Sequence, residues 1–299
     1  MGSVLKYACE AWGWGDHSII DRFDAKILRR ACGVGATVSA TAVRWLFGRL
    51  SVTADIWKQS YKFWYKISSM GAERFEHVAM RASWVLFREY GTGWVSEMLS
   101  VFRRIGFVCE NEDSLPLQGW SPAVINAKFV IFSQLVDEYW VQKMRQDMLA
   151  ANSKYDFLLL THPAFGAADV IKATWRWDLR RFLCKFLLCD HGLEIERGRR
   201  GAARIHKEER FCTFCSKLGG RNVGDERHVL DVCLQYEKQR VQILDCIQKS
   251  GVDINNHGSS IFLVLTELDQ YRITTRMKVW QAMASFAKAI MERLPSISK

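Results

Sequence analysis

The segment Cys212–Cys233, CTFCSKLGGRNVGDERHVLDVC, holds three cysteines and one histidine at the spacing Cys-x2-Cys-x12-His-x4-Cys. Two thiolates two residues apart can face one ion from a tight turn, and a histidine and a further cysteine can complete a tetrahedron. The predicted ligands of a structural Zn²⁺ are Cys212, Cys215, His228 and Cys233. Four protein ligands leave no position for water or substrate. The alternative is buried cysteines and a core histidine, as we expect for Cys184, Cys189 and Cys246.

A basic stretch precedes this segment. Between residues 197 and 210 the net charge is +4, and the cations are Arg197, Arg199, Arg200, Arg204, Lys207 and Arg210. Guanidinium groups match phosphate oxygens in shape and charge, so these six residues are predicted to bind nucleic acid. A solvated charged loop is the alternative interpretation.

Elsewhere the apolar residues recur with a helical period, and only 4 prolines interrupt the chain. No stretch alternates in the manner of a strand, so the predicted fold is mainly α. Residues 151–168 are expected to form a boundary, 192–210 an irregular segment and 261–265 a short apolar stretch. Helices are expected over residues 18–33, 40–50, 55–69, 74–90, 95–105, 121–150, 169–189, 234–249 and 273–293.

The helix expected over residues 55–69 carries Lys58, Lys62 and Lys66 four residues apart, which aligns them along one face. Such a row is either a solvated face beside a core stripe or a surface that follows a nucleic-acid backbone. We include these three lysines among the predicted nucleic-acid-binding residues.

Lys and Arg number 42 and Asp and Glu 32, so the net charge is +10. This charge favours a phosphate-rich partner, either nucleic acid or an anionic membrane surface. The 9 cysteines are scattered, and we find no signal peptide and no apolar run of about 20 residues. We therefore expect an intracellular, reducing location, in the nucleus or the cytoplasm.

No catalytic residues are predicted. Gly13-x-Gly15 and Gly33-x-Gly35 lack the third glycine of a phosphate-binding loop, and neither a serine elbow nor His-Glu-x-x-His occurs. A zinc deaminase would need proline before the first cysteine, where this chain has Phe211.

Three segments around the cysteines share one pattern. Leu187–Arg199, LLCDHGLEIERGR, is similar to L-R-x-x-x-H-x-L-x-I-E-x-G-R, and Glu209–Cys215 fits E-R-x-C-x-x-C. Asp225–Arg240 fits acidic-x-x-H-x-L-x-x-C-x-x-Y-x-x-x-R. Together they resemble the region leading into the C-terminal zinc knuckle of non-LTR retrotransposon reverse transcriptases of the LINE and jockey type.

The N-terminal part resembles the same family. Leu5–Gly13, LKYACEAWG, is similar to the L-x-Y-G-x-E-x-W segment after the polymerase palm, with Ala8 in place of glycine, and Phe63–Ile67 is similar to a helix of the form F-W-x-K-L. The resemblance implies a helical thumb-like region over residues 1–150 and a helical, basic linker over 151–210. A CCHC zinc knuckle over 211–240 and C-terminal helices over 241–299 would follow.

The family holds catalytic Mg²⁺ with aspartates of an (F/Y)-x-D-D turn, but this chain has no Asp-Asp pair. The resemblance therefore implies a fragment of an RNA-directed DNA polymerase that is inactive alone and binds RNA or DNA. Its further expected partner is the polymerase half of a retroelement protein, and no membrane is expected. The alternative function is a helical protein–protein adaptor or scaffold derived from a retroelement.

Overall fold

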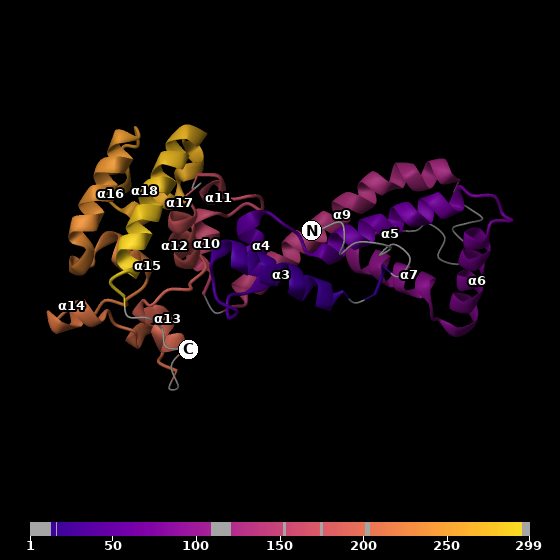
Figure 1. The fold of residues 1–299 in the computed structure, drawn as a ribbon, viewed down its shortest axis with the longest axis horizontal. Helices are drawn as coiled ribbons and strands as arrows, with labels where there is room; N and C mark the ends of the chain where they lie inside the picture. Colours follow the sequence, from indigo (N-terminus) through magenta and orange to yellow (C-terminus); the bar gives the residue numbers. More distant parts are fainter. Residues whose placement is uncertain are drawn as a thin grey trace. The chain divides into compact units, whose positions relative to one another are not determined.

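The computed structural model describes residues 13–15, 17–108, 121–151, 154–173, 176–200 and 204–294. These residues form helices joined by turns (Figure 1), and the only strand-type pairing among them is an antiparallel bridge between Phe211 and Val223. The predicted mainly α fold is confirmed. None of the described helices has the length and apolar character needed to cross a bilayer. Residues 5–12, which carry most of the resemblance to the segment after the palm, lie outside the described residues.

The chain divides into two compact units. Unit 1 comprises Met1–Asp24 and Leu50–Arg145, and unit 2 comprises Ala25–Arg49 and Gln146–Lys299. The predicted division into four regions, with boundaries after residues 150, 210 and 240, does not follow these units, because residues 25–49 belong to unit 2, and it stays a prediction.

Unit 1 is held together by aromatic packing. It contains α5 (Val52–Ser68), α6 (Phe75–Tyr90), α7 (Trp94–Ile105) and most of α9 (Pro122–Leu149), and α5 runs alongside α9 in Figure 1. The ring of Tyr61 stacks on Phe132 with centroids 4.5 Å apart, and its hydroxyl donates to the Ile125 carbonyl at 3.1 Å. Burial of such large rings stabilises this unit, because each removes a large apolar area from water. The buried aromatic residues of this core are Trp14, Trp57, Tyr61, Trp64, Trp84, Phe102, Phe107 and Phe132.

The start of α5 is fixed by Asp21, in the first turn of α3 (Ser18–Cys32). Its carboxylate accepts from the Ser51 hydroxyl at 2.6 Å, the Val52 amide at 2.9 Å and the Thr53 hydroxyl at 2.7 Å. An anion at a helix N-terminus also interacts favourably with the helix dipole. This contact, together with the Ser51 cap on the Thr53 amide, explains why α5 begins three residues before the predicted Asp55.

Unit 2 is arranged around α18 (Ile273–Met291), which packs against α11 (Asp169–Ala173), α12 (Trp177–Leu187) and α16 (Glu237–Lys249) (Figure 1). Its buried face is formed by Val279, Trp280, Met283, Ala284, Phe286, Ala287 and Ile290. The unit also contains α3 from Ala25 onward, the end of α9 from Gln146, and α4 (Ala40–Phe47), α10 (Asp156–Thr161), α13 (Glu194–Arg200), α14 (Thr213–Lys217), α15 (Glu226–Asp231) and α17 (Ile261–Thr266). Short 3-10 turns cover Lys207–Glu209, Leu234–Tyr236, Ile254–His257 and Leu268–Gln270.

Several expected elements differ in detail. The segment 192–210, expected to be irregular, contains α13, and the expected boundary 151–168 contains α10. The single helix expected over 169–189 is present as α11 and α12, and residues 174 and 175 lie outside the described residues. Helices of five to seven residues show too little of a 3.6-residue period to be recognised, and tertiary packing rather than propensity stabilises them.

A close backbone crossing decides the end of α4. Gly48 has φ 59°, and its amide donates to the Trp45 carbonyl at 3.0 Å. A Cβ at Gly48 would lie 2.2 Å from the Ala167 nitrogen and from the Gly166 carbonyl carbon. The Ala168 amide donates to the Leu46 carbonyl at 3.1 Å, so the segment 166–168 is pinned across this helix end.

We predict that Gly48→Ala lowers the free energy of unfolding by roughly 2–5 kcal/mol, because left-handed strain adds to a backbone clash. The matched control is Gly258→Ala in the same unit, where φ is 57° and no atom lies within 4 Å of the added Cβ. This control should lose only about 1–2 kcal/mol. Denaturant unfolding followed by circular dichroism measures both, and equal losses would contradict the crossing.

Candidate metal centre

The first two cysteines lie on a short hairpin. Phe211 pairs with Val223, the Cys212 amide donates to the Asn222 carbonyl at 2.8 Å, and the Gly224 amide donates to the Arg210 carbonyl at 2.9 Å. Cys215 follows in α14, and its carbonyl accepts from the Gly220 amide at 2.9 Å. The chain therefore turns tightly enough to direct both sulfurs to the same side.

The other two donors come from α15 and the turn after it. Asp225 caps α15 by accepting from the His228 amide at 2.8 Å, which fixes the position of the histidine on the first turn. The His228 carbonyl accepts from the Cys233 amide at 2.8 Å, so the last cysteine folds back against the same helix.

Cys212, Cys215, His228 and Cys233 form a buried cluster with all four donor atoms within 4.8 Å of one another. The Cys233 sulfur lies 3.8 Å from the sulfurs of Cys212 and Cys215, and the Cys215 sulfur lies 3.4 Å from His228 Nε2. Tetrahedral bonds of the usual zinc lengths give about 3.8 Å between two sulfurs and about 3.6 Å between sulfur and nitrogen. The cluster could therefore hold one metal ion.

The buried surroundings of these side chains oppose ionisation of the thiols unless a cation is bound. Burial raises the pKa of Cys233 to about 12 and also raises the pKa of Cys212, against the opposing effect of amides that donate to each sulfur. Burial lowers the pKa of His228, so the imidazole is neutral and has a lone pair to offer. Thiols of raised pKa become thiolates only when a cation displaces their protons, which is the coupling expected at a metal site.

The segment preceding the hairpin supports it. The Ile195 amide donates to the Gly224 carbonyl at 3.1 Å, and the Glu194 carboxylate accepts from the Thr213 hydroxyl at 2.7 Å. The Arg210 guanidinium donates to the Ile195 carbonyl at 3.0 Å and to the Ile205 carbonyl at 2.8 Å. We call residues 207–236 the metal module. The helix α13 supports this module through the contacts of Glu194 and Ile195.

A second group, Cys189, His191 and Glu226, also brings metal-binding residue types together. His191 Nε2 lies 2.8 Å from Glu226 Oε1, whereas two ligands on one tetrahedral ion would be about 3.3 Å apart. Burial opposes ionisation of Glu226, but hydrogen bonds from His191 and other donors outweigh it and lower its pKa. This geometry is that of a buried hydrogen-bonded pair, which ties the segment before α13 to α15.

The structure divides the six predicted cations of the basic stretch into two classes. Arg199 pairs with Glu196. Arg200 donates to the Cys189 carbonyl at 2.7 Å and pairs with Asp190 at 3.3 Å. Arg210 donates to the backbone carbonyls of Ile195 and Ile205, as described above. The side chains of these three face the protein. Arg197, Arg204 and Lys207 are exposed.

The three predicted lysines of unit 1 also differ in exposure. Lys58 pairs with Asp137 at 2.6 Å and is only 20% exposed. Lys62 lies over the ring of Phe129, 4.9 Å from its centroid, and is exposed, as is Lys66.

Among the predicted buried thiols, Cys184 and Cys189 are buried, but Cys246 is exposed on α16, so that expectation was wrong for Cys246.

Reasoning from sequence missed the supporting residues Glu194 and Glu226 and the structural use of Arg210. Arg210 and Glu226 each stand two residues before a predicted ligand, which is the signal that could have found them, whereas Glu194 carries no such signal. Comparison of the chain with protein-family models, with curated proteins and with solved structures finds no match.

We predict about one bound metal ion per purified chain, falling to about zero in Cys212→Ser, because a three-ligand remnant binds far more weakly. Elemental analysis measures the ratio. Cys246→Ser, an exposed thiol outside both groups, and Cys189→Ser should both keep the ion. Two ions in the native chain, with one lost in Cys189→Ser, would show that the His191–Glu226 group is a second metal site.

Proposed function

We propose that this chain is the nucleic-acid-binding C-terminal part of a reverse transcriptase of the non-LTR retrotransposon type, non-catalytic on its own. Its metal module would hold a structural Zn²⁺ and present cations and aromatic rings to RNA or DNA. The observation that carries the proposal is the Cys212/Cys215/His228/Cys233 cluster, whose geometry fits a closed tetrahedral site.

The donor set favours zinc. Three thiolates and one imidazole are the soft and intermediate ligands that Zn²⁺ accepts in tetrahedral sites, whereas Mg²⁺ and Ca²⁺ select oxygen. Because protein atoms fill all four positions, the ion would organise the fold and perform no chemistry. Cys212, Cys215, His228 and Cys233 would then act together as one staple between the hairpin and α15.

The surface of the metal module supports nucleic acid as the partner. Phe211 and Phe214, on either side of Cys212, are 37% and 38% exposed although they are aromatic. Lys207, Lys217 and Arg221 are exposed on the same short module. Rings that stack on bases beside cations that contact phosphates form the combination used to bind single strands.

We predict that the chain binds single-stranded RNA with an affinity that falls as salt rises, with a logarithmic slope of about −2 if about three exposed cations contact phosphates. Fluorescence anisotropy between low and physiological ionic strength measures the slope. Cys212→Ser should lose most of this binding, because the module unfolds without its ion.

The double variant Arg204→Gln/Lys207→Gln should make the slope shallower by about 1.4. Its control, Lys238→Gln/Lys249→Gln, removes the same charge from exposed positions of α16. Binding that is independent of salt, or equal effects of the two double variants, would count against the proposal.

A specific surface favours the alternative function, a protein–protein adaptor. Along α6, Phe75, Val78, Val85 and Leu86 are 81%, 50%, 51% and 47% exposed, and their spacing puts them on one face of the helix. Exposed apolar faces of this kind mark interaction sites. If the adaptor function holds, Val78→Glu would abolish binding of a palm-containing polymerase segment and leave RNA binding unchanged.

A further inference from the structure

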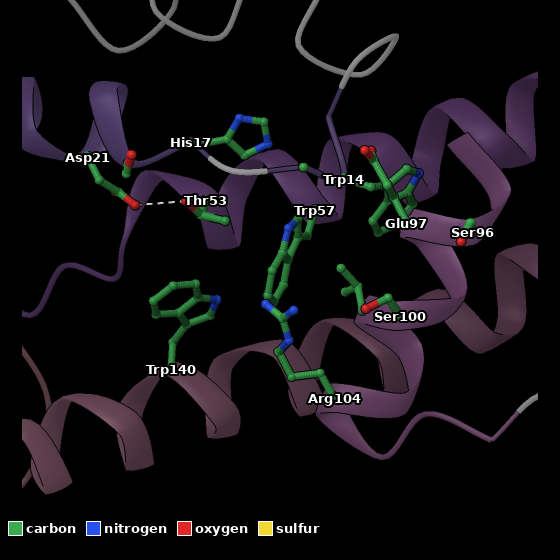
Figure 2. Close-up of a pocket in the computed structure, with 13 residues that line it drawn as sticks. Trp14, His17, Asp21, Thr53, Trp57, Ser96, Glu97, Ser100, Arg104 and Trp140 are labelled. Atoms are coloured by element: carbon green, nitrogen blue, oxygen red, sulfur yellow. Dashed lines mark hydrogen bonds between the residues drawn. The ribbon is translucent and has the colours of Figure 1, made fainter. Parts of the chain in front are cut away.

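Unit 1 contains a pocket of about 620 Å³ (Figure 2), which lies outside the metal module and its basic stretch. Trp57 of α5 and Trp140 of α9 stand side by side in it, and Arg104 reaches toward them from α7. Its volume lies within the range of small-molecule sites, which combine apolar walls with a few polar groups.

Three tryptophans form the aromatic wall of the pocket. The rings of Trp57 and Trp140 have centroids 5.6 Å apart, and Trp140 is only half-buried. Trp14 and Trp57 are 3% and 2% exposed, and the indole N–H groups of Trp14, Trp57 and Trp140 have no hydrogen-bond partner in the structure. Because these three nitrogens are buried, the part of the wall that a ligand can contact is the partly exposed ring of Trp140.

The charged groups of the pocket are not equivalent. The guanidinium of Arg104 lies 5.9 Å from the centroid of Trp57, is exposed, and makes no ion pair with any described residue. The carboxylate of Asp21 is oriented toward Ser51, Val52 and Thr53, which donate to it as neutral groups and do not cancel its charge. Glu97 is exposed at the side of the pocket and can accept from an amino group.

We propose that this pocket binds one nucleotide of a single strand, with the base against Trp140 and the phosphate at Arg104. The inference rests on the proposed nucleic-acid function and adds a second site, in unit 1. A planar ring can stack on the exposed face of Trp140 while a phosphate attached to it contacts Arg104, so a nucleotide uses both features of the pocket at once. A bare anion would use only Arg104, and an apolar ligand would leave the polar groups without partners.

The test uses two probes, free AMP and an eight-nucleotide single-stranded RNA, with the full chain. Calorimetry should detect both, and Trp140→Leu should weaken both by at least about fivefold through loss of stacking. Tyr90→Leu, which removes an exposed aromatic residue of α6 in the same unit, is the control and should bind like the native chain.

A second variant keeps the test valid if Trp140→Leu fails to fold. Arg104→Gln changes an exposed side chain and should make the salt slope for the RNA shallower by about 0.7, the effect of one phosphate contact. Arg103→Gln removes the same charge one residue away on α7, outside the pocket lining, and should leave the slope less changed.

The metal-site variant separates the two proposals. If AMP binds equally to the native chain and to Cys212→Ser, the pocket acts independently of the metal module, as proposed. If RNA binds and Cys212→Ser abolishes it, but Trp140→Leu and Arg104→Gln bind like the native chain, the pocket proposal is overturned and the proposed function stands. Failure of AMP to bind at millimolar concentration, together with unchanged RNA binding by both pocket variants, is equally decisive against the pocket.

Discussion

Three buried thiols and one imidazole occupy the same few ångströms of unit 2, and the surrounding fold depends on this convergence. Burial keeps the thiols of Cys212 and Cys233 protonated in the absence of a cation, because their pKa values are raised. A bound divalent ion would stabilise the thiolates and with them the folded metal module, since charges attract strongly in a low-dielectric site. Between Phe211 and Gly224 the only buried side chains are those of Cys212 and Cys215, whereas α15 buries Val229 and Leu230. The shared ion would replace the core that so short a hairpin cannot build.

Several side chains between residues 189 and 210 contact the protein itself and support the metal module. Arg210 clamps the carbonyls of Ile195 and Ile205, Arg200 holds the turn at Cys189 and Asp190, and His191 reaches Glu226. Arg210 and His191 are defined positions of the sequence pattern described for residues 187–240, whereas Arg200 and Glu226 are not. Arg210 and His191 thus serve the folding of the metal module, whereas the side chains of Arg204 and Lys207 are exposed at the surface.

Unit 1 follows a different principle, in which large aromatic rings rather than an ion hold the helices. Tyr61 joins α5 to α9 through its ring and its hydroxyl, and Asp21 fixes the start of α5. Packing many rigid rings together leaves irregular space and unpaired indole donors, as at Trp57 and Trp140. The same feature that builds the core thus creates the pocket in which a planar ligand fits.

The sequence by itself determined the helical class, most long helices and the four members of the metal cluster, because the 3.6-residue period and the Cys/His spacing are local signals. Only the tertiary structure decided which cations face solvent. Lys58, Arg200 and Arg210 have partners 79, 10 and 15 residues away, at Asp137, Asp190 and the Ile195 carbonyl. The partner of Arg199, Glu196, is by contrast a local one on the same helix. It also decided the short helices α10 and α13 and the tryptophan pocket, since these depend on contacts between segments far apart, which no local pattern encodes.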